Sequence, residues 1–305
     1  MRVSVIIPCY NAARFIAEAL ESVLRQTHAD TVAIVVDNGS TDKTAEIAEA
    51  FGARVTVIRQ PGKSGPAAAR NAAVEVADGG AIAFLDGDDR WHPEKVARQL
   101  AFLEAHPDYG VVHTAVRHID AGGDDIDRPG GAIPWRIAQG ECLGGLLAHN
   151  TITTSTVLVR RETLGADRFP VDLFAGEDWD LWLRLAARTR IGYLEEALTD
   201  YRVHDQNTTR CLDLVLGGRL AVTDRVLARG LAPRHRRAAV RHRKGVLAGL
   251  GHVAYERGEL TQARALFREA GACIDTLGAV RYVAAALPGS VWAPFRWCWH
   301  RLGHS

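Results

Sequence analysis

The first half of the chain alternates between short apolar runs and longer segments in which apolar residues recur at helical spacing. The apolar runs occupy residues 3–7, 32–36, 55–58 and 81–85. The helical segments between them are 12–27, 42–52 and 66–77. This alternation is typical of a mostly parallel sheet with helices on both faces. We therefore predict an α/β fold with a Rossmann-like, mostly parallel central sheet.

Polar clusters follow three of these predicted strands directly. The first strand ends in CYN, the second in DNGSTD and the fourth in DGDD. The carboxyl ends of parallel strands meet at one edge of the sheet, where ligands bind in open α/β folds. We expect the three clusters to converge on one binding site.

The DGDD cluster brings Asp86, Asp88 and Asp89 within four positions. A helix N-cap explains one of these carboxylates, and a solvated turn would leave like charges that raise one another's pKa. A divalent cation removes that repulsion, because Mg²⁺ or Mn²⁺ takes one or two carboxylates and completes its shell with water and phosphate oxygens. The residues alone leave these three interpretations open.

The rest of the chain continues the pattern and then changes. We predict strands over 111–119 and 153–161 and helices over 93–105 and 177–188, with Trp91 to Pro93 opening the first of these helices. Residues 120–134 are rich in Gly, Asp and Pro and indicate a loop. From about residue 210 only helical patterns occur, and 251–270 has the spacing of a tetratricopeptide-like hairpin.

Charge and cysteine usage exclude some classes of partner and location. A formal net charge of +1 argues against nucleic acid as a partner of the whole protein. Five scattered cysteines without a CxxC pair indicate reduced thiols and a cytoplasmic setting. The tail 281–305 has three tryptophans beside Arg and His. It fits either a peripheral element at the inner face of the cell membrane or a packed capping helix.

Four segments, taken together, resemble the family-two glycosyltransferases. In the family's order they are VSVIIPCYNAARFIAEALESVLRQT, VVDNGSTDKT, ARNAAVEVADGGAIAFLDGDDRWHPEK and AGEDWDLWLRL. The resemblance implies a GT-A glycosyltransferase domain over 1–209, with nucleotide-sugar binding in about 1–119 and the acceptor side and catalytic base in about 120–209. A helical region, 210–305, follows. The resemblance also implies inverting transfer of a sugar from a nucleotide-diphosphate donor, UDP-linked as a first guess, to a hydroxyl acceptor.

Within this resemblance, LDGDD holds the family's DxD motif. Asp86 would then face the ribose of the nucleotide and Asp88 would bind Mg²⁺ or Mn²⁺. Asp89 would be a further ligand or a supporting group. His204, in the segment YRVHDQNTT that resembles the family's closing segment, is the candidate that approaches the metal from the other side.

The resemblance also assigns residues around the nucleotide. Pro8 and Tyr10 would line the nucleotide pocket, and Asp37 would hydrogen-bond the base. The family usually has a second aspartate after the one at 37, where this chain has Asn38. Arg70 and Asn71 match a motif near the diphosphate and ribose, and the planar fork of arginine suits phosphate.

Glu177 and Asp178 open the predicted aromatic helix and are the expected catalytic carboxylates. Acids in the first turn of a helix are favoured by its dipole whatever their function. The resemblance assigns Asp178 as the base that takes the proton from the acceptor hydroxyl. General-base help of this kind contributes roughly a hundred- to ten-thousand-fold in rate.

Bacterial members of the family often build cell-surface polysaccharide or glycolipid, so we expect a glycan or lipid-linked acceptor. Two alternatives remain. A sugar nucleotidyltransferase would share the sheet and the metal site, but it should carry a glycine-rich motif where this chain has CYNAAR. A non-catalytic scaffold would use the helical hairpin and aromatic tail to dock partners. The presence of Asp37, Asp86, Asp88 and Asp178 counts against it.

Overall fold

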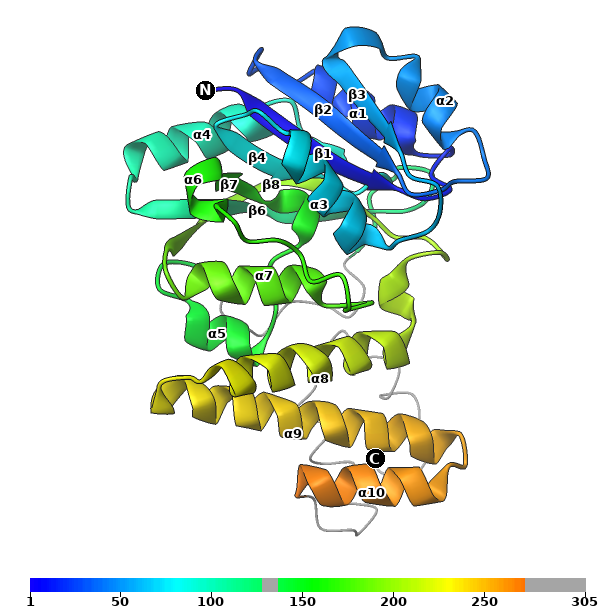
Figure 1. The fold of residues 1–305 in the computed structure, drawn as a ribbon, viewed down its shortest axis with the longest axis vertical. Coiled ribbons are helices and arrows are strands. Elements are labelled where there is room, and N and C mark those ends of the chain that lie inside the picture. Colours follow the sequence, from blue (N-terminus) through cyan, green and yellow to red (C-terminus); the bar gives the residue numbers. More distant parts are fainter. Residues whose placement is uncertain (128–136, 272–305) are drawn as a thin grey trace.

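The computed structural model describes residues 1–127 and 137–271. Its centre is an eight-stranded sheet in the order β3-β2-β1-β4-β7-β6-β8-β5 (Figure 1). The strands are β1 (Val3–Cys9), β2 (Thr31–Asp37), β3 (Val55–Arg59), β4 (Ala81–Phe84), β5 (Arg90–Trp91), β6 (Tyr109–Ile119), β7 (Leu158–Arg160) and β8 (Arg190–Arg202). Neighbours among β3, β2, β1 and β4 are parallel, as are β6 and β8. The predicted mostly parallel sheet is therefore confirmed.

Helices cover both faces of this sheet. In chain order the helices of the described residues are α1 (Ile16–Leu24), α2 (Thr44–Glu49), α3 (Pro66–Val76), α4 (Lys95–Ala105), α5 (Leu143–Ala148), α6 (Arg161–Leu164), α7 (Glu177–Ala186), α8 (Leu212–Arg229), α9 (Pro233–Glu256) and α10 (Leu260–Ala270). One buried cluster joins the strands to α1 and α4, and another joins them to α3 and α7. The apolar stripes read from the sequence are thus buried against opposite faces.

The second half of the sheet departs from the prediction. Only Leu158–Arg160 of the expected strand 153–161 pairs, antiparallel to both β4 and β6, while Thr154–Thr156 forms a 3₁₀ turn. Trp91, expected to open a helix, lies in β5 and pairs antiparallel with β8. Strand β8, over 190–202, is not among the strands predicted from the sequence. There the adjacent Glu195 and Glu196 break the apolar alternation, and the β6–β8 register shifts around them.

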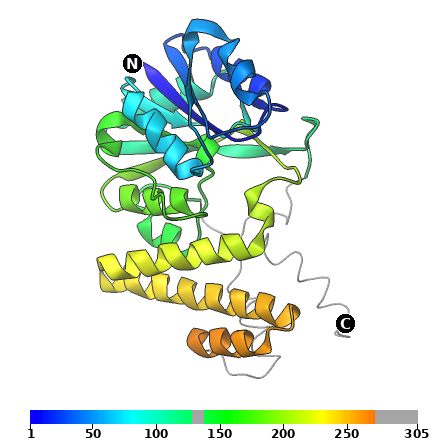
Figure 2. The same cartoon turned by 45° about the vertical axis from the view of Figure 1, so that its right-hand side comes forward.

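From Leu212 onward the described residues are helical, as expected. Helices α8, α9 and α10 lie one below the other at the end of the molecule away from β1 to β3 (Figures 1 and 2). The hairpin predicted over 251–270 consists of the end of α9 and all of α10. The tryptophan-rich tail 281–305 lies outside the described residues. Within the part that the structure describes, no helix has the length and apolar character needed to cross a bilayer.

Candidate active site

The ends of β2, β1 and β4 form one edge of the sheet, as the sequence predicted. The strands are adjacent and parallel, and the Asn38 N–H donates to the carbonyl oxygen of Cys9 at 2.8 Å. The acidic turn also lies against the end of β1, because a Cβ added at Gly87 would be 2.8 Å from the Cys9 Sγ. The three polar clusters therefore meet around the end of β1.

Asp37 is the buried carboxylate of this edge. It is 5% exposed, and among the described residues its Oδ1 has no hydrogen-bond partner. The neighbouring Asn38 is used internally, since its amide oxygen accepts from the N–H and hydroxyl of Ser64 at 2.8 and 2.7 Å. Tyr10 is exposed and carries the Lys63 Nζ 4.0 Å from its ring centre, and Pro8 is half-buried beside it. Asp37 Oδ1 is therefore a buried acceptor at this edge that no described residue satisfies.

Arg70 joins the strand ends to the start of α7. Its guanidinium donates to Asp86 Oδ1 at 2.7 Å and to Glu177 Oε1 at 2.8 Å. Burial lowers the pKa of this guanidinium, but the charges of Asp86 and Glu177 outweigh burial and raise it. The side-chain amide of Asn71 instead exchanges hydrogen bonds of 2.8 and 2.9 Å with the backbone of Phe169. Arg70 thus faces the carboxylates, while Asn71 holds the segment that precedes α7.

Asp88 meets His204 on the other side of the turn. Its Oδ2 lies 2.8 Å from the His204 Nε2 and 3.5 Å from the Asn207 amide nitrogen. Burial and then the charge of Asp86 raise the pKa of Asp88. Within the described ranges no three His, Cys, Asp or Glu side chains are arranged as a complete metal site. A carboxylate with one imidazole still fits Mg²⁺ or Mn²⁺, because these ions take few protein ligands and complete their shell with water and phosphate.

Asp89 has a different environment from the other two aspartates. It is 2% exposed. Its Oδ1 accepts the backbone N–H of Arg202 at 2.9 Å, and its Oδ2 accepts the Ser155 hydroxyl. Burial raises its pKa strongly. These contacts fit the supporting role named as one option from the sequence, because they anchor the acidic turn to β8.

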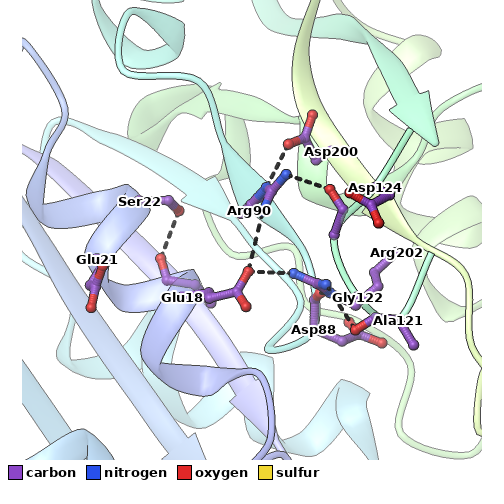
Figure 3. A network of polar contacts seen from close by, with 12 residues as sticks. Glu18, Glu21, Ser22, Asp88, Arg90, Ala121, Gly122, Asp124, Asp200 and Arg202 are labelled. Carbon is purple, nitrogen blue, oxygen red and sulfur yellow. Dashed lines mark hydrogen bonds and ion pairs between the residues drawn. The ribbon is translucent and has the colours of Figure 1, made fainter. Parts of the chain in front are cut away.

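Arg202 continues this anchoring from the end of β8. It is 1% exposed, and its Nε donates to the carbonyl oxygen of Asp88 at 2.8 Å. Its other nitrogens reach the Glu18 carboxylate at 2.7 Å and the carbonyl oxygens of Asp120 and Ala121 at 3.3 and 3.4 Å. Figure 3 shows Arg202 beside Asp88 and the 121–122 turn, with Glu18 opposite. One arginine of β8 therefore fixes the backbone of Asp88 relative to α1 and the 120–121 turn.

Asp178 stands at the start of α7, half-buried. Its Oδ1 accepts the Trp179 N–H at 2.7 Å, and its Oδ2 accepts the Thr154 hydroxyl at 3.0 Å. The amide nitrogen of Asn150 lies 3.5 Å from the same Oδ2. Burial raises the pKa of Asp178, and the charge of Arg70 acts in the opposite direction. This carboxylate is thus oriented by three donors, with the Arg70 charge favouring its ionised form.

Glu177 is more enclosed and is 8% exposed. Burial raises its pKa, while the bond to Arg70 works against that shift. The structure therefore gathers Asp86, Arg70, Glu177 and Asp178 along one path from β4 to α7. The residues that hold these groups in position are not among those predicted from the sequence. Those are Glu18, Asn150, Thr154, Ser155 and Arg202.

The chain is similar in sequence to known glycosyltransferases. Residues 4–161 match the family model described as Glycosyl transferase family 2. A putative teichuronic acid biosynthesis glycosyltransferase of Bacillus subtilis, TuaG, is 33% identical over 205 residues, covering 66% of this chain and 79% of that protein. An uncharacterized glycosyltransferase of Rickettsia felis is 32% identical over 210 residues. The chain covers 34% of its length, about a third.

Solved structures show the same architecture. TarS of S. aureus in complex with UDP-GlcNAc superimposes with a TM-score of 0.62 at 22% identity, covering 81% of this chain and 71% of that one. The mannosyltransferase PcManGT from Pyrobaculum calidifontis, in complex with GDP-Man and Mn²⁺, gives a TM-score of 0.63 at 20% identity, covering 93% and 85%. These likenesses confirm the GT-A type fold expected from the sequence.

Proposed function

The chain belongs to glycosyl transferase family 2, and from this premise we propose that it transfers a sugar from a nucleotide-diphosphate donor to an acceptor hydroxyl by inverting direct displacement. The observation that carries the proposal is the Arg70 bridge. Its bonds of 2.7 Å to Asp86 and 2.8 Å to Glu177 unite the strand-end carboxylates with those of α7. A displacement reaction needs donor-binding and base groups on one path in this way.

The base of the nucleotide is proposed to bind at Asp37. The free Oδ1 of this buried carboxylate supports the role, because an unsatisfied buried acceptor is costly until a donor such as a ring N–H reaches it. Pro8 and the exposed Tyr10 are proposed to border the base. Uracil is the first choice and TarS was solved with UDP-GlcNAc, whereas PcManGT was solved with GDP-Man.

The diphosphate is proposed to bind beside Asp88, with Mg²⁺ or Mn²⁺ held by Asp88 and His204. When bound, the cation compensates the negative charge that develops on the departing nucleoside diphosphate. Asp86 is assigned to the ribose, with Arg70 fixing its carboxylate. Asn71 is assigned to the same region, and Asp89 supports the turn that carries Asp88.

The reaction proposed at α7 is a direct displacement. The acceptor oxygen attacks the anomeric carbon opposite the diphosphate, the bond between that carbon and the diphosphate oxygen breaks, and the acceptor proton passes to Asp178. Asp178 must be ionised to take this proton, which the positive charge of Arg70 favours. Glu177 contributes by holding Arg70 in place.

The biological setting proposed is polysaccharide or glycolipid synthesis, with a glycan or lipid-linked acceptor. Names of relatives support this, since TuaG is described as acting in teichuronic acid biosynthesis and AmsB of Erwinia amylovora in amylovoran biosynthesis.

Calorimetric titration of UDP and of GDP, each with Mn²⁺ and with EDTA, tests the donor assignment. We expect metal-dependent UDP binding that weakens about tenfold or more in Asp37→Ala, the typical effect of losing a charge-assisted hydrogen bond. Asp30→Ala, an exposed aspartate at the other end of β2, should leave the affinity unchanged. Preferential binding of GDP would indicate a GDP-linked donor in place of a UDP-linked one. Failure to bind UDP, GDP, dTDP or CMP would instead favour the scaffold alternative.

Arg202 gives a second prediction, about the metal-dependent part of this binding. Arg202→Lys keeps the charge, but one ammonium group cannot replace the guanidinium at Asp88, Glu18 and the 120–121 carbonyls. We expect the Kd for UDP in Mn²⁺ to rise about tenfold, as for other groups that orient a metal ligand. Binding in EDTA should not change.

Arg117→Lys is the matched control for this variant, because Arg117 binds Asp200 in the same polar network but does not contact Asp88. Equal Mn²⁺-dependent affinity in the wild type and Arg202→Lys would show that the Asp88 backbone does not depend on Arg202. Thermal denaturation of each variant ensures that binding is compared on folded protein.

A further inference from the structure

Helix α8 runs directly against the segment that leads into the catalytic carboxylates. At Gly218 a Cβ would lie 2.3 Å from the carbonyl oxygen of Ala175, so only glycine permits this approach. On the next turn Val222 lies 3.1 Å from the Cβ position of Gly176. Arg219 therefore projects from a stretch of α8 whose backbone touches the residues just before Glu177.

Arg219 differs from the other arginines of α8 in having no ion-pair partner among the described residues. Arg225 is paired with Asp172, and Arg229 with Asp180 at 2.9 Å. Arg219 is half-buried, and no described residue forms an ion pair or hydrogen bond with its side chain. Burial lowers the pKa of its guanidinium, and the charge of Asp178 opposes that shift. A half-buried guanidinium without a side-chain partner has free donors for a bound anion, which would stabilise it.

His242 of α9 lies in the same group. Its Nδ1 lies 2.7 Å from the carbonyl oxygen of Ala148 and therefore carries the proton, which leaves Nε2 as an acceptor. In the described part of the chain this buried Nε2 has no hydrogen-bond partner. The ring of Trp179, the residue after Asp178, meets the His242 ring in an edge-to-face contact with centres 5.0 Å apart.

The charge of Arg219 acts on two histidines, His149 and His242. Burial and then the Arg219 charge lower the pKa of His149 to about 4 and that of His242 to about 3. Both imidazoles are therefore neutral near pH 7, and the Arg219 guanidinium supplies the positive charge of this group. His149 also precedes Asn150, whose amide approaches the Asp178 carboxylate.

We propose that Arg219 and His242 form an anion-recognising acceptor subsite beside Asp178, so that the accepted sugar or polyol carries a phosphate or carboxylate near its reacting hydroxyl. The guanidinium binds the anionic group, and the His242 Nε2 accepts a hydrogen bond from a neighbouring hydroxyl. Arg70 is already bound to Asp86 and Glu177, whereas Arg219 has no such partner among the described residues. This inference rests on the proposed transferase function and specifies its acceptor class.

The test compares simple sugars as ligands, with and without saturating UDP and Mn²⁺. D-glucose 6-phosphate and D-glucuronate are titrated against D-glucose, with binding followed by ligand-observed NMR. We expect at least one charged sugar to bind about tenfold more tightly than glucose, the typical value of one charge-assisted hydrogen bond. Preference for the phosphate indicates a phosphorylated acceptor, and preference for glucuronate indicates a uronic acid.

Arg219→Gln should abolish the preference, and Arg219→Lys should restore part of it. Arg225→Gln is the matched control from the same helix and should keep the preference, because its partner is Asp172. Equal binding of charged and neutral sugars by the wild type would overturn the subsite, as would a preference retained in Arg219→Gln. Weaker UDP binding in Arg219→Gln would also overturn it, by assigning Arg219 to the donor. UDP binding by the wild type leaves the proposed function standing in each of these outcomes.

Discussion

Asp88→Asn should lose the metal-dependent part of nucleotide binding and reduce sugar transfer about a hundredfold or more. The substitution keeps the size of the side chain but removes the charge that would hold a divalent cation beside His204 and Asn207. UDP affinity in EDTA should match that of the wild type, since the amide still accepts from the His204 Nε2. Calorimetry with Mn²⁺ and with EDTA measures both effects on one sample.

Asp205→Asn provides the control for this experiment. Asp205 is exposed and follows His204 directly, so the variant makes the same charge change on the same segment without touching the turn after β4. Its Mn²⁺-dependent UDP binding should equal that of the wild type. If UDP binding by Asp88→Asn depended on Mn²⁺ as strongly as in the wild type, the cation would be held by other residues.

The strand-end carboxylates were predictable because their position follows from local pattern and one topological rule. Asp37, Asp86 and Asp88 come immediately after apolar runs, and parallel strands carry such residues to a common edge. Nothing beyond strand identity was needed to place them together. The family resemblance then supplied their separate roles.

The supporting residues were not predictable, because their contacts depend on pairing between distant segments. Ser155 and Thr154 reach Asp89 and Asp178 only because 154–156 turns before the short antiparallel β7. Arg202 reaches Asp88 across 114 positions of sequence, from a strand whose register against β6 shifts along its length. Hydrophobic periodicity along the chain does not indicate which distant segments pair.

The environment of Arg219 was likewise not predictable from the sequence. In sequence it is one of several arginines on an amphipathic helix, and a solvated ion pair is the ordinary expectation for each. Only the close approach at Gly218 and the pairing of Arg225 and Arg229 with aspartates distinguish it.

Asp178→Asn should lower the rate of transfer by about a hundred- to ten-thousand-fold while leaving Mn²⁺-dependent UDP binding within about twofold of the wild type. The amide occupies the same space beside Thr154 and Trp179 but cannot take the acceptor proton. Transfer of labelled sugar from the donor found by calorimetry measures the rate, with water as the acceptor where no other is supplied. A variant that keeps wild-type rates would remove Asp178 as the base.

The same substitution should stabilise the fold near neutral pH. Burial raises the folded-state pKa of Asp178 above its unfolded value. Such a group stabilises the fold at low pH, and the contribution is lost as pH rises through the folded pKa. At pH 7 ionisation of this carboxylate therefore costs more free energy in the folded than in the unfolded protein, and asparagine removes that cost. We expect a higher Tm for Asp178→Asn at pH 7, and a smaller difference from the wild type at pH 4.

Asp180→Asn, two residues further along α7, should change the Tm in the opposite direction. Its carboxylate is 1% exposed and is paired with Arg184 and Arg229 at 2.9 Å each. Removing this buried charge takes one ion-pair partner from each arginine, and among the described residues Arg184 keeps only its ion pair with Asp167. Opposite Tm shifts for the two asparagine variants would identify Asp178 as a carboxylate kept ionised at the expense of stability, as a general base requires. A lower Tm in both would assign Asp178 a structural role like that of Asp180.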